Sequence, residues 1–415
     1  MISSSMPTDQ ALRPPSAQVA MDERDGRGGS AATQALFVSV VGLLLATGWV
    51  ANHFVALMPL ISERQHLSAT TLDAIFGIYA VGLVPGLLIG GRASDALGRQ
   101  SVALVGPTTA LVGTVAMLLS QQADVLLVGR LIVGVGVGLA MSSCTAWASD
   151  LKGPAGAATA GAVLTAGFAI GPFAGGAIAL AGQPGIRVSF GVAAAIVVVA
   201  MVAAVVAAQR VGVTAPSRAL LPARPAAARQ GTARALSWAI PLAPWVFASA
   251  TLGFVAIPTR LHTGLAAPMA AGAAALIVNG VSGVIQVVAR GGKWGPQAGT
   301  AGAVLAALGY VVSAAGPPTL SLPLGLPLLL VLGCASGLLL REGLIDLEAA
   351  APQRLRGALT GMFYVVTYVG FGLPLILTMV GPAASALILA VMALLASATA
   401  ISRAVRLRRD GHRQN

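Results

Sequence analysis

The stretch Gly91-Arg92-Ala93-Ser94-Asp95-Ala96-Leu97-Gly98-Arg99-Gln100 lies between two long apolar segments. It places glycines, a carboxylate and arginines in a connection that is too short to leave a membrane surface. Glycine takes a positive φ freely and lets helix backbones approach closely, so Gly91 and Gly98 predict a tight turn. Asp95 can pair with an arginine or lie at the positive N-terminus of a neighbouring helix. The stretch therefore predicts a charged turn between two membrane helices.

The composition agrees with that prediction. The 415 residues are 56% hydrophobic and only 9% charged, whereas a soluble domain carries about 25% charged residues. We therefore expect an all-α polytopic membrane protein, because helices satisfy their own backbone groups in lipid. A net charge of +12 would suit nucleic acid as a partner, but the distribution of the basic residues, described below, argues against that class.

Apolar segments long enough to span a bilayer, which takes roughly 20 residues, recur along the whole chain. We place twelve transmembrane helices in two six-helix pseudo-repeats, at 36–60, 71–91, 101–120, 124–146, 156–181, 188–210, 236–258, 268–290, 297–316, 320–342, 356–380 and 382–402. The junction between 297–316 and 320–342 is the least sharply defined, because prolines crowd it.

The basic residues indicate the orientation. With the N-terminus inside, all of the 25 Lys and Arg residues fall in cytoplasmic segments except Arg64, Arg187 and Arg260, which fall outside, and Arg130, which stays in the membrane. The positive-inside rule then puts both termini in the cytoplasm. We expect a multi-pass protein of the cytoplasmic (inner) membrane.

The chain divides into two halves. Residues 211–235 interrupt the apolar rhythm with Pro, Arg and Ala, so we assign them to a cytoplasmic linker between an N-terminal bundle, 36–210, and a C-terminal bundle, 236–403. Polar residues 1–35 are expected to form a disordered cytoplasmic tail, and 404–415 a basic one. Short matches recur about 200 positions apart, as in transporters built from parallel repeats. These matches are Asp95 to Gln100 with Gly292 to Gln297, Asp150-Leu151 with Asp346-Leu347, and Gly156-Ala157 with Gly357-Ala358.

Three motifs carry a resemblance to a known family. The first is the turn that contains Gly91, Asp95, Gly98 and Arg99. The second, Arg130-Leu131-Ile132-Val133-Gly134-Val135-Gly136, is similar to an Arg-x-x-Gln-Gly-x-Gly pattern in helix 4, with Val133 in place of Gln. The third, Gly167-Phe168-Ala169-Ile170-Gly171-Pro172-Phe173-Ala174-Gly175-Gly176, resembles a helix 5 pattern of antiporters, although Ala158 stands where a further Gly is usual. The chain thus resembles the major facilitator superfamily, in its drug:proton antiporter-like branch.

The resemblance implies alternating access around a central cavity. It implies a conformational role for the turn motif. In helix 5 it implies a packing role for Gly167, Gly171, Pro172, Gly175 and Gly176. Three of these glycines recur every four residues and so share one helix face, which permits a close helix crossing. Pro172 kinks the helix there.

Arg130 and His53 are the candidate residues of a proton or substrate pathway. A charge inside the bilayer is costly unless it is paired or lines a wet cavity. At 1.5 Å per residue, both residues lie about 9 Å from the outer ends of their helices, and Asn52 adjoins His53. A nearby guanidinium disfavours a protonated imidazole, so the two could respond to protons together. The alternatives remain a clamp on backbone carbonyls for Arg130 and a packing hydrogen bond for His53.

Further candidates lie in the second half. Tyr364 and Tyr368 are four residues apart on helix 11 and face one side, and Asn279 lies at mid-membrane in helix 8. We expect these three side chains to line the cavity, which is otherwise apolar and suits lipophilic substrates. Asn279 is equally well explained as a hydrogen-bonding contact between helices. No Asp or Glu falls in the middle of any helix that we place, which weakens proton coupling and shifts it to His53, Asp73 or Asp95.

The sequence predicts a monomeric secondary transporter that exports small organic molecules, with protons as the coupling ion. An uptake permease or uniporter of the same fold is the first alternative, and a non-transporting membrane sensor is an alternative of another class. The chain contains no Gly-x-x-x-x-Gly-Lys-Ser/Thr run and no His-Glu-x-x-His run, so we expect neither ATP hydrolysis nor a metal enzyme. We expect no cofactor.

Overall fold

The computed structural model describes residues 15–211, 225–352 and 355–412. These residues are almost entirely helical, and Leu261 and Leu320 form an isolated bridge. The helices are α1 (Pro15–Asn52), α2 (Phe54–Gln65), α3 (Ala69–Leu97), α4 (Arg99–Leu119), α5 (Ala123–Ala179), α6 (Gln183–Val211), α7 (Pro225–Ala239), α8 (Ala243–Thr251), α9 (Ala267–Gly291), α10 (Gln297–Ala315), α11 (Leu322–Ala350), α12 (Arg356–Tyr368) and α13 (Leu373–His412). Short irregular turns follow α8 and α12: η1 (Leu252–Ala256), η2 (Pro258–Arg260) and η3 (Val369–Gly372).

The described helices supply twelve membrane crossings. Eleven continuous stretches are long and apolar enough to span a bilayer. The last of them, Leu359–Arg409, has 51 residues, more than twice the roughly 20 that one crossing needs. Gly381 divides it with a φ of 77° and a ψ of 171°, a conformation open to glycine. The helices predicted at 356–380 and 382–402 are therefore separate crossings, and the predicted fold class is confirmed.

The turn predicted over Gly91 to Gln100 is shorter than expected, because α3 continues to Leu97 and Gly91 lies within that helix. Gly98 separates α3 from α4 with a φ of 90°, a value that side-chain-bearing residues rarely take. A second positive φ, at Gly153, divides α5 into the crossings Ala123–Gly153 and Ala155–Ala179. Two prolines also recur at matching places, because Pro59 lies in α2 and Pro258 begins η2, about 200 positions later.

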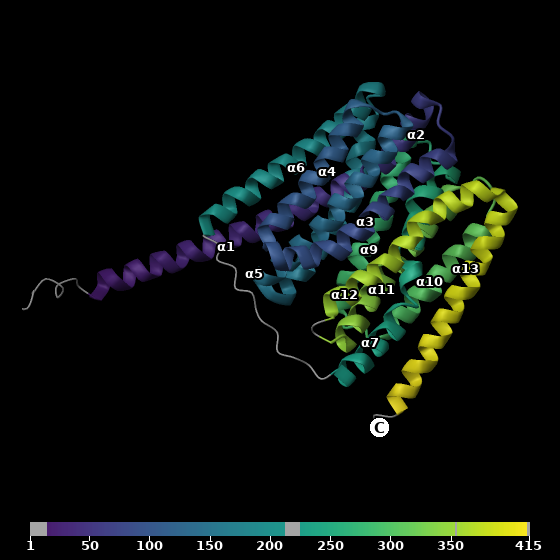
Figure 1. The fold of residues 1–415 in the computed structure, drawn as a ribbon. Coiled ribbons are helices and arrows are strands. Elements are labelled where there is room, and N and C mark those ends of the chain that lie inside the picture. The colour runs from purple at the N-terminus through teal and green to yellow at the C-terminus, as the bar shows by residue number, and fades with distance from the viewer. Residues whose placement is uncertain (1–14, 212–224, 353–354, 413–415) are drawn as a thin grey trace, which may run out of the picture.

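Some boundaries differ from prediction. Residues 15–35, expected to be disordered, belong to α1, since Ala, Gln, Met, Glu and Arg favour a helix that continues beyond the membrane. The purple end of α1 projects from the bundle in Figure 1. Of the expected linker 211–235, residues 212–224 lie outside the described part, and the helix α7 begins at Pro225. The helix predicted to end at 342 continues to Ala350.

Helices pack first within each half and then across a shared interface. In the first half α1, α3 and α4 pack on α5, and in the second half α10 packs on both α11 and α13. The interface between the halves is formed mainly by α5 with α9, and by α3 with α12 and α13. Figure 1 shows the purple-to-teal helices beside the green-to-yellow ones. The middle of this interface holds the candidate site.

Candidate functional site

A small cavity lies where the two halves meet. It has a volume of about 10 Å³, which is room for about one water molecule. The lining is mostly aromatic with two amides, and consists of Ala51, Asn52, Tyr79, Phe168, Phe247, Phe254, Asn279, Tyr368 and Phe371. The structure thus brings together Asn52, Asn279 and Tyr368 from the predicted pathway.

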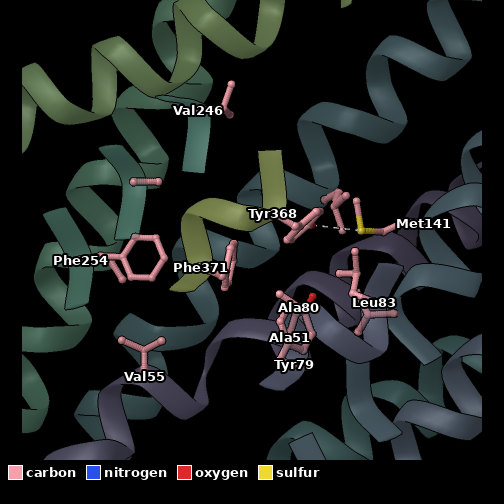
Figure 2. Close-up of a cluster of buried hydrophobic side chains, with 14 of the residues drawn as sticks. Ala51, Val55, Tyr79, Ala80, Leu83, Met141, Val246, Phe254, Tyr368 and Phe371 are labelled. Atoms are coloured by element: carbon pink, nitrogen blue, oxygen red, sulfur yellow. Dashed lines mark hydrogen bonds between the residues drawn. The ribbon is translucent and has the colours of Figure 1, made fainter. Parts of the chain in front are cut away.

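Aromatic rings close this centre. Phe371 stacks on Phe76 of the other half, with 5.2 Å between ring centroids, and contacts Phe247 at 5.3 Å and Tyr368 at 5.1 Å. Figure 2 shows Phe371 and Phe254 in one cluster with Val55, Ala51 and Tyr79. Its dashed line joins the Tyr368 hydroxyl to the sulfur of Met141 across the interface, at 3.8 Å. The state described is therefore closed at its middle by contacts that join the halves.

The two asparagines converge on one backbone oxygen. The side-chain amide of Asn52 donates to the carbonyl of Phe168 at 3.0 Å, and that of Asn279 donates to the same oxygen at 3.4 Å. Pro172 is four residues after Phe168 and has no N–H, so the Phe168 carbonyl lacks its helical donor. The proline of the helix 5 motif thus creates an acceptor that side chains from both halves satisfy.

The second half repeats this arrangement. Pro374 removes the α-helical (i+4) donor of the Gly370 carbonyl. That oxygen accepts from the N–H of Leu373 and from the hydroxyl of Thr251, the latter at 2.9 Å. Thr251 follows Asn52, and Pro374 follows Pro172, by about 200 positions, the spacing of the internal repeat. The internal repeat therefore extends to this hydrogen bond. The crossing contact of Asn279 is what distinguishes the first copy.

Arg130 is fully buried beside the cavity. Its Nη1 donates to the carbonyl of Ala51 at 2.8 Å, while Nε and Nη2 have no hydrogen-bond partner. Three aromatic rings surround the guanidinium: its carbon lies 4.5 Å from the ring centre of Tyr79, 5.0 Å from Phe54 and 6.0 Å from Phe76. Ala51 and Tyr79 both line the cavity, so the charge is one side chain away from it.

His53 is buried but faces away from the cavity. Its ring meets Phe190 of α6 edge-on at 5.2 Å, and Nδ1 lies 3.2 Å from the Trp49 carbonyl and 3.1 Å from the Val50 carbonyl. Because a carbonyl only accepts, Nδ1 carries the proton in this arrangement. Nε2 has no partner. No hydrogen bond joins His53 to Arg130 among the described contacts, although the two lie within electrostatic range.

The turn motif forms an ion-pair cluster at the predicted cytoplasmic end. Arg99 contacts Asp95 at 2.5 Å and Asp150 at 2.7 Å, and it also donates to the Ser94 hydroxyl at 2.7 Å. Lys152, near Asp150 in sequence, lies over the ring of Phe37 at 4.3 Å. The predicted contact with the N-terminus of α12 concerns residues 355–357, and the side chains of 356 and 357 lie outside the described part. Gly91 has open space around it.

The helix 5 motif presents two faces. A Cβ on Gly167 would lie 2.4 Å from the Leu45 carbonyl oxygen, and one on Gly171 would lie 2.8 Å from Cα of Trp49, so this face needs glycine against α1. Gly175 continues it at the His53 backbone. Gly176 instead abuts Pro268 of α9, where a Cβ would lie 2.5 Å from a carbonyl oxygen. The helix 5 motif therefore makes close contacts both within its own bundle and across the interface between the halves.

A buried ion cluster in the second half was missed by the sequence analysis. Arg403 contacts Asp346 at 2.5 Å and Glu342 at 3.8 Å, and Arg341 also pairs with Glu342. Glu342 is 2% exposed and Arg403 is 4% exposed. The sequence analysis placed Glu342 at the end of a helix, whereas α11 continues eight residues further, so this acid lies inside its last third. The match of Asp150 with Asp346 was the available signal.

The remaining candidates lie outside the cavity lining. Tyr364 is half-buried against the ring of Phe363, with 6.0 Å between centroids, and is not among the residues that line the cavity. Asp73 is 6% exposed at the outer end of α3. Within the residues that the structure describes, no three His, Cys, Asp or Glu side chains group as metal ligands.

Comparison with known proteins agrees with this architecture. The sequence profile of the Major Facilitator Superfamily matches residues 38–374. A crystal structure of a peptide transporter POT in complex with sulfate superposes with a TM-score of 0.73 at 13% identity, over 90% of this chain and 95% of that one, which shows the fold alone.

Two curated relatives match shorter segments. The "Multidrug resistance protein 2" of Bacillus subtilis (strain 168) is 27% identical over 174 residues, 41% of each chain. The "3-(3-hydroxy-phenyl)propionate transporter" of Escherichia coli (strain K12) is 28% identical over 122 residues, 29% of this chain and 30% of that one. The chain thus aligns with less than half the length of each. The profile match covers most of the residues, and the described helices supply twelve crossings. The chain therefore belongs to the Major Facilitator Superfamily and is a multi-pass membrane protein.

Proposed function

We propose that the chain is a secondary active transporter that exports small lipophilic organic molecules by alternating access, driven by protons. The observation that carries this proposal is the aromatic cavity at the interface of the halves, closed by contacts between α3, α8, α12 and η3. Opening these contacts at one end of the bundle enlarges the cavity toward one side of the membrane. An apolar lining with two amides suits lipophilic substrates that carry few hydrogen-bonding groups.

One of the two named relatives supports export of this class. That relative is called a multidrug resistance protein, and its aligned segment covers the size of about one bundle. The aromatic side chains that line the cavity here provide stacking faces for many flat apolar molecules. We place the protein in the cytoplasmic membrane, as a monomer with both termini in the cytoplasm.

Proton coupling requires a titratable group that becomes accessible first from one side of the membrane and then from the other. No carboxylate lines the cavity among the described residues. His53, Asp73 and Glu342 are the buried candidates. His53 is next to Asn52, which contacts the cavity, so we propose it as the first candidate for the coupling group.

The test is substrate flux in inverted vesicles that contain the full chain, with and without an imposed pH gradient. Export driven by protons predicts accumulation that collapses when the gradient is dissipated. Accumulation that is unchanged without the gradient would contradict proton coupling and favour a uniporter. No flux of any compound above empty vesicles would contradict transport and favour the membrane-sensor alternative.

An uptake permease is the second candidate. Two observations favour it: the cavity lining lacks a carboxylate, and one relative is named for the transport of a hydroxyphenyl-propionate. Right-side-out vesicles separate the two directions, because a permease accumulates substrate there when the outside is acidic, whereas an exporter does not.

A further inference from the structure

We propose that Arg130 and Tyr79 form the anion-binding part of the substrate site, so that the transported molecules include aromatic or lipophilic carboxylates. This inference rests on the proposed function and narrows its substrate class. The donors concerned are Nε and Nη2 of Arg130 and the hydroxyl of Tyr79, which have no hydrogen-bond partner among the described residues. Arg130 then does more than donate to a backbone carbonyl.

The first argument is the geometry of the guanidinium. Nη1 is occupied by the Ala51 carbonyl, and the free groups are Nε and Nη2. These two N–H groups lie on the same edge of the planar fork and point in parallel. That edge binds a carboxylate through two parallel hydrogen bonds. Nη1 is thus occupied by a carbonyl, and the edge formed by Nε and Nη2, which suits a carboxylate, is free.

The second argument is charge. Arg130 is 0% exposed, and none of the ion pairs among the described residues includes it. A buried cation is costly unless it is paired or faces a wet cavity. The surrounding rings of Phe54, Phe76 and Tyr79 supply part of the compensation. Arg403, the other deeply buried arginine, has Asp346 and Glu342 as partners. The contrast indicates that the partner of Arg130 comes from outside the chain.

The third argument is the neighbouring hydroxyl. Tyr79 is 1% exposed, and its hydroxyl has no hydrogen-bond partner. Tyr79 lines the cavity and its ring lies against the guanidinium. A phenol hydroxyl donates well to a carboxylate. Arg130 with two free donors and Tyr79 with one are therefore in contact beside a cavity whose lining is mostly aromatic, which suits an anion with a flat apolar body.

The closed state holds a cavity of about 10 Å³, so such a substrate enters when the halves separate. Tyr79 contacts Phe371 of the other half, with 5.9 Å between ring centroids. Moving η3 away from α3 uncovers the Tyr79 ring, on which the Arg130 guanidinium packs. Substrate access and movement of the halves are thereby linked through one aromatic contact.

The test uses the full chain purified in detergent and two probes of the same shape, 4-phenylbutyrate and its uncharged amide 4-phenylbutyramide. We expect the carboxylate to raise the thermal unfolding temperature and the amide to raise it far less. Arg130→Gln should weaken carboxylate binding by about 30-fold or more, the usual consequence of removing one partner of a buried charge pair. Tyr79→Phe keeps the ring and should weaken carboxylate binding several-fold.

The matched control is Arg260→Gln. Arg260 binds the carbonyls of Ser313, Gly316 and Pro317 in an outer loop, so it is an arginine that only clamps backbone. It should leave the binding of both probes unchanged. If Arg130→Gln does not fold, Tyr79→Phe and the two probes on the parent protein still decide the question. A parent stabilised equally by both probes, or by neither, contradicts the anion site, as does unchanged carboxylate binding in Tyr79→Phe and Arg130→Gln.

The failure of this proposal and that of the proposed function are separable. If inverted vesicles transport the cationic dye ethidium and 4-phenylbutyrate does not compete, the proposed transport function stands and the anion site is rejected. Competition by the carboxylate but not by the amide supports it.

Discussion

The two halves of the molecule carry equivalent ion clusters in different surroundings. In the first half Arg99 joins Asp95 and Asp150 at the surface, where the acids are 66% and 54% exposed. In the second half Arg403 joins Asp346 and Glu342, with Glu342 only 2% exposed. Asp346 is the repeat partner of Asp150, but the position that matches Arg99 is Pro296.

The arginine of the second cluster therefore comes from a different helix than the arginine of the first. Arg403 comes from α13 and donates to the carbonyl of Pro296 at 3.2 Å, so its guanidinium lies where the loop arginine of the first half would be. The Trp238 ring covers it, with 5.2 Å from the guanidinium carbon to the ring centre. A solvated cluster can break and reform during a transport cycle at small cost, whereas a desolvated one ties α10, α11 and α13 into a single body. The difference suggests a moving first-half cluster and a fixed second-half cluster.

The largest expected effect follows from removing the buried cation. Arg403→Gln leaves Glu342 and Asp346 desolvated without their shared partner, and we expect a loss of about 3 kcal/mol in the free energy of unfolding. Arg99→Gln, its equivalent, should cost less than about 1 kcal/mol, because solvent screens the exposed pair. Chemical denaturation of the purified variants measures both. Equal losses would break the comparison between the clusters.

The next effect concerns the carbonyls that proline frees in each half. Asn52→Ala should cost about 1–2 kcal/mol, because the buried Phe168 carbonyl loses a donor. Thr251→Val should cost less, about 0.5–1 kcal/mol, because the Gly370 carbonyl loses one donor but keeps the N–H of Leu373. Restoring the helical N–H with Pro172→Ala should reduce the cost of Asn52→Ala. A double-mutant cycle from denaturation data tests this. A cost of Asn52→Ala that does not depend on Pro172 would show that the proline does not create the acceptor.

These contrasts show what the sequence could and could not predict. Each crossing was predicted at its place in the chain, with ends that differ by up to eight residues, because hydropathy over about 20 residues is a local property. The partners of Arg403 and of the Phe168 carbonyl were not predicted, since they are more than 50 positions away in the sequence. These contacts depend on how the helices pack. Glu342 was missed because the end of α11 is set by contacts with α7 and α10, not by its own apolar pattern.

A smaller effect on stability, but a clear one on transport, is expected at the turn motif. Asp95→Asn should leave the protein inserted and change the free energy of unfolding by less than about 1 kcal/mol. It should lower flux several-fold, because it weakens the contact that holds Arg99 when the cytoplasmic side is closed. Asp346→Asn is the matched variant and should mainly lower stability. Normal flux of Asp95→Asn at normal abundance would reject a conformational role for the surface cluster.

The smallest effect on flux is expected from substitution of His53. Its pH dependence tests whether the first half carries the group that responds to protons. The position that matches His53 in the second half is Leu252, about 200 residues later, so that copy has no equivalent titratable group. The His53 ring is fully buried between the carbonyls of Trp49 and Val50 and the ring of Phe190. Its free Nε2 gains a proton only when a change of conformation admits water, and histidine is the side chain whose charge changes in the physiological range.

We therefore expect the pH profile of flux in the parent to contain a step that His53→Gln lacks, with little change in the flux at the optimum. His262→Gln, in an exposed outer position, is the control and should keep the step. Profiles of the same shape and midpoint in the parent and His53→Gln would make His53 a packing residue. Coupling would then have to use Asp73 or the clusters at the predicted cytoplasmic end, and the choice between the fixed and the moving cluster would decide which half carries the proton.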